Sequence, residues 1–176
     1  MKRAGACVVA TALALVAPPA SPSNDAPARL FSISKSENRN YVQYAERLDA
    51  SCAPAGDRPV FAYWQMLEHG PVAVEPLLAR ERPAYGLASQ TVVERHDGHG
   101  SVRVILHALP DAPLLVESWR DRNGVCQASA QTPIAGVAAR LFNVHAVLRW
   151  PFGVARILVS GWAVADGQVV HDARMP

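Results

Sequence analysis

Lysine is nearly missing from this chain, and no cluster of other basic residues takes its place. Lys2 and Lys35 are the two lysines, and the arginines are scattered along the sequence. The 17 basic residues exceed the 15 acidic residues by two, and Lys2 and Arg3 account for that excess. A protein that binds nucleic acid concentrates positive charge on one face. We therefore expect no nucleic-acid partner.

Strong catalytic signatures are missing as well. The sequence has no Gly-rich phosphate loop, no H-E-x-x-H, no G-x-S-x-G and no paired C-x-x-C, so none of the activities that these motifs mark is indicated. The glutamates are separated by whole predicted strands and turns, and their spacing defines no acid/base pair. We expect no cofactor, and the catalytic residues, if the protein has any, stay unknown.

The chain has no apolar run near its N-terminus that is long enough to span a membrane. Two basic residues precede the mostly apolar residues 4–17, which fall short of the roughly 20 residues of a spanning helix. Prolines and small residues follow. This order predicts a signal peptide over residues 1–20, cleaved after Ala20 or, as a second choice, after Ala28.

The rest of the chain has the length of one domain. Residues 21–28, "SPSNDAPA", form a predicted disordered tether, and residues 29–176 form a predicted single β-rich domain. We expect an exported protein, periplasmic or extracellular, with no stable membrane span after signal cleavage.

Cysteine is scarce, and only Cys52 and Cys126 remain after signal cleavage. An oxidising compartment makes two such thiols more typical of a disulfide than of a catalytic site. We therefore predict a bridge between Cys52 and Cys126. The alternative is that one of them is a nucleophile served by a histidine.

Helical periodicity is rare, and short alternating segments separated by turn residues dominate. The fold class is therefore all-β, an antiparallel β-sandwich or β-barrel with little helix. Residues 74–86 are the one stretch with a possible helical turn, which Pro83 is expected to end. Turn signals lie at Asp97-Gly98, Asn123-Gly124 and Asp166-Gly167, and a corner is predicted at residues 150–153. The expected strands lie within residues 29–34, 40–48, 59–67, 89–95, 101–109, 113–119, 125–130, 140–149, 154–164 and 168–174.

Histidines gather at the first predicted hairpin, where His96, His99 and His107 lie near Asp97. Imidazoles and a carboxylate in a tight turn can bind a transition metal. A polar, exposed hairpin tip is the favoured interpretation, so we predict no metal site.

His145 is a separate case, because strand alternation places it on one face with Leu141, Asn143 and Val147. The favoured interpretation is a hydrogen-bonded, partly buried imidazole, and the alternative is a general base.

Three stretches of the first half resemble one bacterial family. They are "LFSISKSENRNYVQY", "RPVFAYWQM" and "PLLARERPAYGL", in that order and spacing. The chain resembles domain of unknown function 4833 (DUF4833). The resemblance implies an exported domain whose activity is unassigned, and it carries over no catalytic residues. It rests on Ser36, Asn38, Asn40, Tyr44, Pro59, Val60, Tyr63, Trp64, Glu81, Ala84, Tyr85 and Gly86.

Polar and aromatic residues of these stretches form the candidate ligand site. Side chains two apart in a strand share a face, so two asparagines and a tyrosine are expected to project together, near the aromatic residues of the next strand. Amides, phenols, an indole and a carboxylate are typical of a pocket for a small polar ligand, such as a sugar or a peptide fragment. The predicted ligand-binding residues are Asn38, Asn40, Tyr44, Tyr63, Trp64, Glu81 and Tyr85.

The alternative is that these residues hold the fold together. Asparagines at strand entrances often bond to neighbouring backbone, Trp64 can be a core residue, and Glu81 can pair with an arginine. Three functions follow, with an exported binding module for a small polar ligand or an envelope protein placed first. The others are a structural envelope component and an unrecognised hydrolase that uses Glu81 or a histidine.

Overall fold

The computed structural model describes residues 27–68, 73–149 and 153–175. The predicted signal peptide, residues 21–26 of the predicted tether and residues 150–152 of the predicted corner lie outside the described residues. The first strand begins at Ala28, which the prediction assigned to the last position of the tether.

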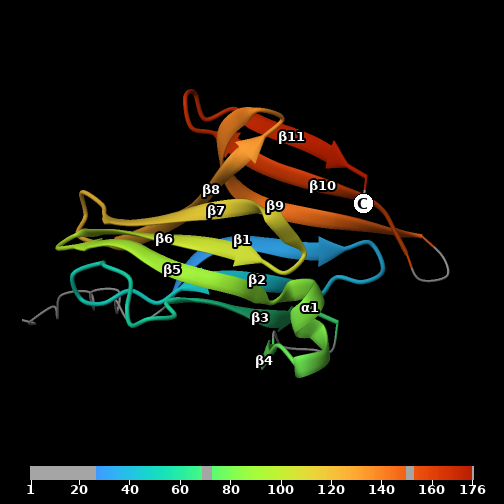
Figure 1. Ribbon diagram of the computed structural model, residues 1–176, viewed down its shortest axis with the longest axis horizontal. Coiled ribbons are helices and arrows are strands. Elements are labelled where there is room, and N and C mark those ends of the chain that lie inside the picture. The colour runs from blue at the N-terminus through green and yellow to red at the C-terminus, as the bar shows by residue number, and fades with distance from the viewer. Residues whose placement is uncertain (1–26, 69–72, 150–152, 176) are drawn as a thin grey trace, which may run out of the picture.

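The described residues form eleven strands and two single-turn helices, which confirms the all-β prediction (Figure 1). The turn predictions at Gly98 and Gly124 are confirmed too, because both residues have positive φ, 78° and 79°. The elements are β1 (Ala28–Lys35), β2 (Tyr41–Glu46), β3 (Val60–Met66), β4 (Ala73–Pro76), η1 (Ala79–Glu81), α1 (Arg82–Tyr85), β5 (Leu87–His96), β6 (His99–Leu106), β7 (Leu109–Arg120), β8 (Cys126–Ile134), β9 (Val137–Arg149), β10 (Gly153–Ala163) and β11 (Val169–Arg174).

The strands form one sheet that divides into two branches at β9. The N-terminal branch has the order β4-β3-β2-β1, and the central branch has the order β5-β6-β7-β8. Residues 137–141 of β9 pair with β8, whereas residues 143–146 pair with β1. β10 runs along the other side of β9, and β11 follows β10. The β1–β9 pairing is parallel, and the other described strand pairings are antiparallel.

The two branches face each other as the layers of a sandwich. The path of the sheet ends at β4 and β5, and these two strands are not paired to each other in the described part of the chain. Of the two predicted architectures, the closed barrel is therefore wrong. In Figure 1, β10 and β11, in orange and red, rise beyond the two branches.

The hydrophobic core lies between the branches, and alternate side chains of the strands point toward it. Its centre is Tyr44, whose ring stacks on Phe31 with centroids 4.3 Å apart. The buried core residues are Leu30, Phe31, Ile33, Val42, Tyr44 and Val60 from the N-terminal branch, Val102, Val104, Leu106, Leu114, Val116, Ala130 and Ile134 from the central branch, and Ala139, Leu141, Val144 and Val159 from β9 and β10.

A β-bulge in β9 inverts the face of its second half. Leu141 and Val144 are both buried, although strict alternation would place them on opposite faces. The pairing with β10 shifts at this point, because Asn143 pairs with Ser160 whereas Leu141 pairs with Gly161. The prediction that Leu141 shares a face with Asn143, His145 and Val147 is therefore wrong, since Phe142 is an extra residue in the register.

The segment before β5 also differs from its prediction in one respect. Pro83 is the second residue of α1, so it helps to begin the helix instead of ending a helical turn. Proline is tolerated there because the first-turn N–H groups have no partner within the helix. The short, exposed strand β4, which precedes this helix, was not predicted because its four residues show no clear alternation.

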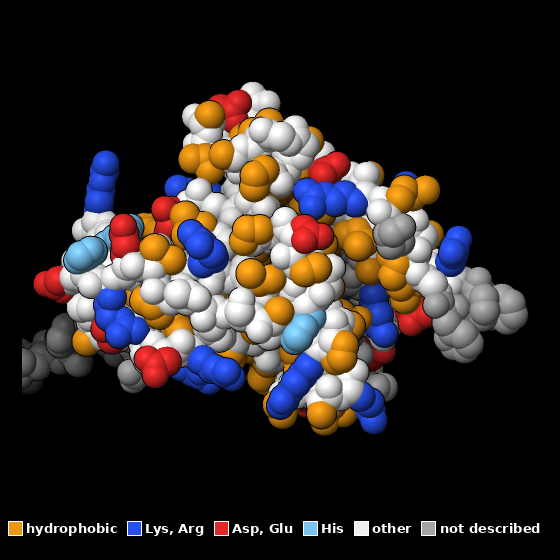
Figure 2. Space-filling model, in the orientation of Figure 1, with side chains coloured by type: hydrophobic (Ala, Val, Ile, Leu, Met, Phe, Trp, Pro, Cys, Tyr) orange, Lys and Arg blue, Asp and Glu red, His pale blue; other side chains and the backbone are white. Residues whose placement is uncertain are grey.

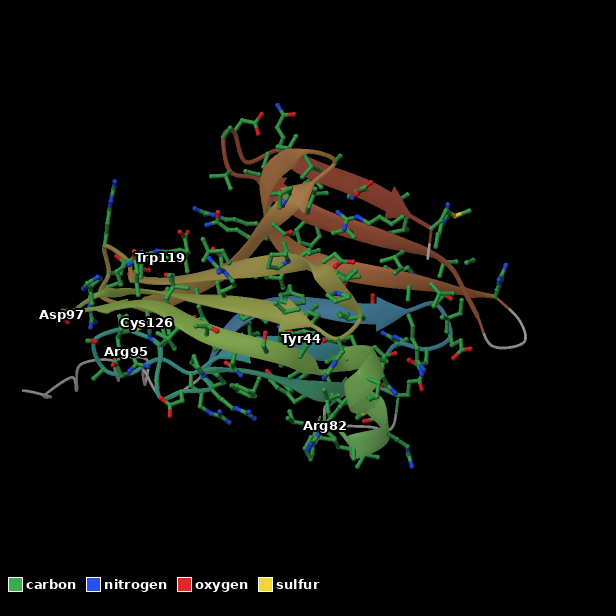
Figure 3. The ribbon with its side chains drawn as sticks, viewed as in Figure 1. Tyr44, Arg82, Arg95, Asp97, Trp119 and Cys126 are labelled. Carbon is green, nitrogen blue, oxygen red and sulfur yellow. A yellow bond between two sulfur atoms is a disulfide. The ribbon has the colours of Figure 1, made fainter. Side chains whose placement is uncertain are left out.

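The loop of residues 47–59, here called the clasp loop, joins the two branches at one end of the sandwich. The predicted disulfide between Cys52 and Cys126 is present, with Cα atoms 5.1 Å apart, and it connects this loop to the first residue of β8. The alternative of a nucleophilic cysteine is therefore wrong. Cys126 marks this end of the molecule in Figure 3.

Backbone contacts reinforce the disulfide. The Gly98 N–H donates to the Ser51 carbonyl at 2.8 Å, and the Arg120 guanidinium donates to the Ala50 carbonyl at 2.6 Å. Pro54 packs so closely on Gly100 that a Cβ at position 100 would lie 2.1 Å from Pro54 Cδ. The clasp loop is thus fixed to both hairpins of the central branch.

We predict that removing the disulfide with the double substitution Cys52→Ala and Cys126→Ala lowers the free energy of unfolding by about 4 kcal/mol. The bridge spans 74 residues of sequence, and cross-linking a loop of that length restricts the unfolded chain by about this amount. Urea denaturation with and without reductant measures the effect. Reduced wild type should match the double variant, and equal stability of the reduced and oxidised wild type would contradict the prediction.

Candidate functional site

Four of the seven predicted site residues meet at the end of the sandwich opposite the clasp loop. They form the Trp64 cluster, which consists of Tyr44, Trp64, Glu81 and Tyr85. The Trp64 indole N–H donates to the Glu81 carboxylate at 3.0 Å, and the same oxygen accepts the Leu78 N–H at 2.8 Å. The Trp64 and Tyr85 rings meet edge to face with centroids 5.3 Å apart.

The phenol of Tyr44 forms a hydrogen bond inside this cluster. Its O–H donates to the Tyr85 carbonyl at 2.5 Å, and the side chain is fully buried. Burial, with a smaller contribution from Tyr85, raises the pKa of Tyr44 far above its ordinary value of 10.0. Tyr44 therefore stays a neutral hydrogen-bond donor at any physiological pH. Figure 3 shows it deep in the sandwich, between the disulfide end and α1, which Arg82 marks.

The Trp64 cluster connects the two branches. Tyr44 and Trp64 belong to β2 and β3, whereas Glu81 and Tyr85 belong to the helical segment that leads into β5. A second contact also connects the two branches. The Gln90 side-chain amide of β5 forms two hydrogen bonds of 3.0 Å with the backbone N–H and carbonyl of Val60 in β3. The donors of Trp64 and Tyr44 are thus already paired within the protein.

The other three predicted site residues lie elsewhere. Asn38 Oδ1 accepts the Asn40 N–H at 3.2 Å, and Asn40 Oδ1 accepts the Leu67 N–H at 2.8 Å. Both asparagines precede β2, so strand alternation does not govern their direction. Tyr63 lies on the opposite face of β3 from Trp64, where it stacks on Phe61 with centroids 5.7 Å apart. The structure therefore divides the predicted site into separate groups.

A different polar group lies on the face of β1, β9, β10 and β11 that points away from the core, here called the outer face. Ser32 donates to Asn143 Oδ1 at 3.1 Å, and Ser34 approaches the same oxygen at 3.4 Å. Ser34 Oγ lies 3.0 Å from Nδ1 of His145. The prediction of a hydrogen-bonded, partly buried His145 is confirmed.

The polar group continues across the next two strands. Asn143 pairs with Ser160 in the register of β9 and β10, and Ser160 pairs with His171 of β11. Ser160 Oγ and His171 Nδ1 lie 2.9 Å apart. A row of serine, asparagine and histidine side chains therefore crosses the outer face at right angles to the strands.

An aromatic pair borders this polar row. Trp162 follows Ser160 on the same face of β10, and its ring packs against Phe142 with centroids 4.3 Å apart. Trp162 is 47% exposed. Nearby, the Arg140 guanidinium lies 5.6 Å above the ring of Trp119, which extends the aromatic surface toward β7.

Sequence reasoning placed His145 and Asn143 on one face correctly but wrongly added Leu141 to that face. Trp162 and Ser160 were missed altogether. A run "SGW" inside an apolar strand does show alternation between a small inward residue and two outward residues, but the partner strand is not visible in sequence. The outer face is identified by the bulge at Phe142, which can be located only from the register of β9 against β10.

Glu46 is the one clear electrostatic anomaly among the described carboxylates. It has no exposed surface, and neither side-chain oxygen has a hydrogen-bond partner among the described residues. Its cross-strand neighbours are Ala28 and Val60. Burial raises the pKa of Glu46 from 4.5 to about 8. By contrast, the hydrogen bond from the Ser51 hydroxyl holds the pKa of the exposed Asp49 below its ordinary value.

The described residues contain neither a cluster of metal ligands nor a membrane-spanning helix. In the part of the chain that the structure describes, no three His, Cys, Asp or Glu side chains lie close enough to hold a metal ion. Within residues 27–68, 73–149 and 153–175, no helix has the length and apolar content needed to cross a membrane. On the face shown in Figure 2, acidic and basic side chains are interspersed, without a large patch of one sign.

The fold and these clusters describe an all-β domain whose polar residues lie on an open sheet face. The model of the family described as Domain of unknown function (DUF4833) matches residues 31–173, so the chain belongs to that family. The match extends well beyond the stretches on which the resemblance rested. Comparison with curated proteins and comparison with solved structures each gave no match.

We predict that the pairing of Trp64 with Glu81 stabilises the fold. Trp64→Phe keeps an aromatic ring beside Tyr85 but removes the N–H, so the free energy of unfolding should fall by about 1–2 kcal/mol. Glu81→Gln should have a similar effect, because it also weakens the acceptor for Leu78. Chemical denaturation measures both variants, with the exposed Glu94→Gln as the control. Unchanged stability of Trp64→Phe would contradict a structural role.

We predict that Glu46 makes the protein less stable as pH rises. Its pKa is raised in the folded state, so its carboxyl stays protonated in the fold while it ionises in the unfolded chain above pH 4.5. Stability is therefore complete below pH 4.5 and is lost progressively up to about pH 8. Glu46→Gln should match wild type at pH 4.5 and exceed it by on the order of 3 kcal/mol at pH 7.

Thermal and urea unfolding across this pH range measure the difference between the two proteins. Asp111→Asn, at an exposed carboxylate, is the control for a general effect of charge. A difference between wild type and Glu46→Gln that does not change with pH would show that Glu46 ionises normally.

Proposed function

We propose that the protein is an exported binding module that holds a small polar ligand on its outer face. The observation that carries this proposal is the anchored row of Asn143, His145 and His171. Hydrogen bonds within the described residues use Oδ1 of Asn143 and Nδ1 of each histidine. They leave Nδ2 of Asn143 and Nε2 of both histidines for another partner.

The anchoring makes these side chains suitable for binding. Each is carried by a β-strand and is oriented by a serine hydroxyl on the neighbouring strand. A polar group that is already ordered in the free protein loses little conformational entropy when it binds a ligand. The outer face can therefore offer three fixed nitrogen atoms at a lower cost than flexible surface residues would.

Two features support export. The first 20 residues have the order of a signal peptide. The disulfide between Cys52 and Cys126 is typical of proteins in oxidising compartments. Together they support a periplasmic or extracellular location.

Binding is favoured over the alternative of a hydrolase. Ser34 and Ser160 each lie near a histidine, but through Nδ1, the nitrogen that in a serine-hydrolase triad contacts the carboxylate. In the hydrogen bonds of the described residues, no carboxylate orients either imidazole. The Ser–His pairs therefore lack the arrangement that activates a serine nucleophile.

Binding on the outer face is also favoured over the originally predicted pocket. A ligand that binds the Trp64 indole N–H or the Tyr44 hydroxyl would have to displace the Glu81 acceptor or the Tyr85 carbonyl. A ligand on the outer face displaces no hydrogen bond of the described residues. The Trp64 cluster is better suited to holding the two branches together.

The first test is native mass spectrometry of the mature protein purified from the exported fraction. We expect a mass excess that disappears on denaturation and identifies a bound ligand. Asn143→Ala should lose that excess, or weaken the affinity for the released ligand at least tenfold (about 1.4 kcal/mol), while the melting temperature changes little. Ser89→Ala, at an exposed position of β5, should retain it.

Two results would contradict the proposal. One is an equal ligand load on wild type and Asn143→Ala, which would place the ligand elsewhere. The other is a bare chain mass together with no envelope component retained by the immobilised protein.

A further inference from the structure

We infer that the ligand of the outer face is a neutral saccharide, one pyranose ring of which stacks on the Trp162 indole. This inference rests on the proposed function and adds the chemical class of the ligand. The observation behind it is separate from the polar row: the large aromatic ring of Trp162 lies beside the row and is 47% exposed.

The Trp162 ring is held in place although it is exposed. It packs on Phe142, with centroids 4.3 Å apart and an interplanar angle of 40°. Both residues lie on strands, and Trp162 is paired with Arg140 on one side and Val169 on the other. A tryptophan that is 47% exposed keeps much apolar surface in water, which folding alone does not favour. Its fixed position offers a rigid platform.

The platform and the polar row are spaced for one sugar unit. Ser160 and Trp162 are two residues apart on the same face of β10, which corresponds to about 7 Å along the strand. Asn143 and His171 flank Ser160 on the adjacent strands. A pyranose ring whose C–H face rests on the indole would therefore present its hydroxyl groups toward the amide and imidazole nitrogens.

The chemistry of the neighbouring side chains favours a neutral ligand. The polar row consists of hydroxyls, an amide and imidazoles, which donate and accept hydrogen bonds as sugar hydroxyls require. The guanidinium of Arg140, which pairs with Trp162 across β9 and β10, lies above the ring of Trp119. Acidic sugars are typically bound by paired basic side chains, and the row supplies none.

An exposed tryptophan can also mark a protein contact, because tryptophan is enriched at protein interfaces. A saccharide and a protein partner would interact differently with the polar row. A saccharide requires donors and acceptors on both sides of the ring, whereas an apolar protein contact tends to exclude uncompensated polar groups. The Asn143 and His171 nitrogens that make no hydrogen bond within the described residues therefore favour the saccharide.

The experiment titrates mature, disulfide-intact protein with two neutral probes, chitotetraose and cellotetraose. Calorimetry and intrinsic tryptophan fluorescence should both show saturable binding of at least one probe. Trp162→Ala should weaken that binding about tenfold or more, and Trp162→Phe should lose less because a ring remains. Val164→Ala is the matched control, since Val164 is also 47% exposed and lies near the end of the same strand.

The outcomes separate this inference from the proposed function. Binding of neither probe, or equal binding by Trp162→Ala, overturns the saccharide. If native mass spectrometry still shows a ligand that depends on Asn143, the proposed function stands without it. Self-association or capture of a purified protein ligand that Trp162→Ala abolishes would assign the platform to a protein contact, which also overturns the saccharide. Because Trp162 is exposed, the variant should fold, and its unchanged melting temperature confirms this.

Discussion

The change of partner along β9 determines the rest of the structure. Its residues 137–141 pair with β8, and its residues 143–146 pair with β1, so one strand belongs to both layers of the sandwich. The bulge at Phe142 lets Leu141 and Val144 both point into the core despite their spacing. The same extra residue turns Asn143 and His145 outward. The bulge at Phe142 thus determines both the core packing and the proposed binding face.

A sandwich that divides in this way must be held together at its open side. The clasp loop and the disulfide do this at one end, and the Trp64 cluster does it at the other. Between them the Gln90 amide takes the place of a strand partner for Val60. Glu46 destabilises the sandwich, because its buried carboxyl has no hydrogen-bond partner among the described residues. Its burial costs stability wherever the free carboxyl would ionise.

The sequence predicts local features well because they depend on local chemistry. Alternation located ten of the eleven described strands, Gly98 and Gly124 located two turns, and the expectation of export led to the prediction of the disulfide. The bulge at Phe142 is not visible, because a single inserted residue inverts the face without disturbing the apolar composition. Trp64, Glu81, Tyr44 and Tyr85 were predicted to meet beside the two asparagines, and the four meet without them. That they bond to one another depends on the position of α1, which no local pattern fixes.

The most direct test of where the ligand binds uses the indole N–H signals of the four tryptophans. In protein labelled with ¹⁵N-tryptophan, each signal is assigned by Trp→Phe substitution and then followed as the ligand from the exported fraction is added. The account predicts that the Trp162 signal shifts with ligand concentration while the Trp64 signal, whose N–H is bonded to Glu81, stays in place. A shift of Trp64 with Trp162 unchanged would place the ligand at the Trp64 cluster and contradict the account.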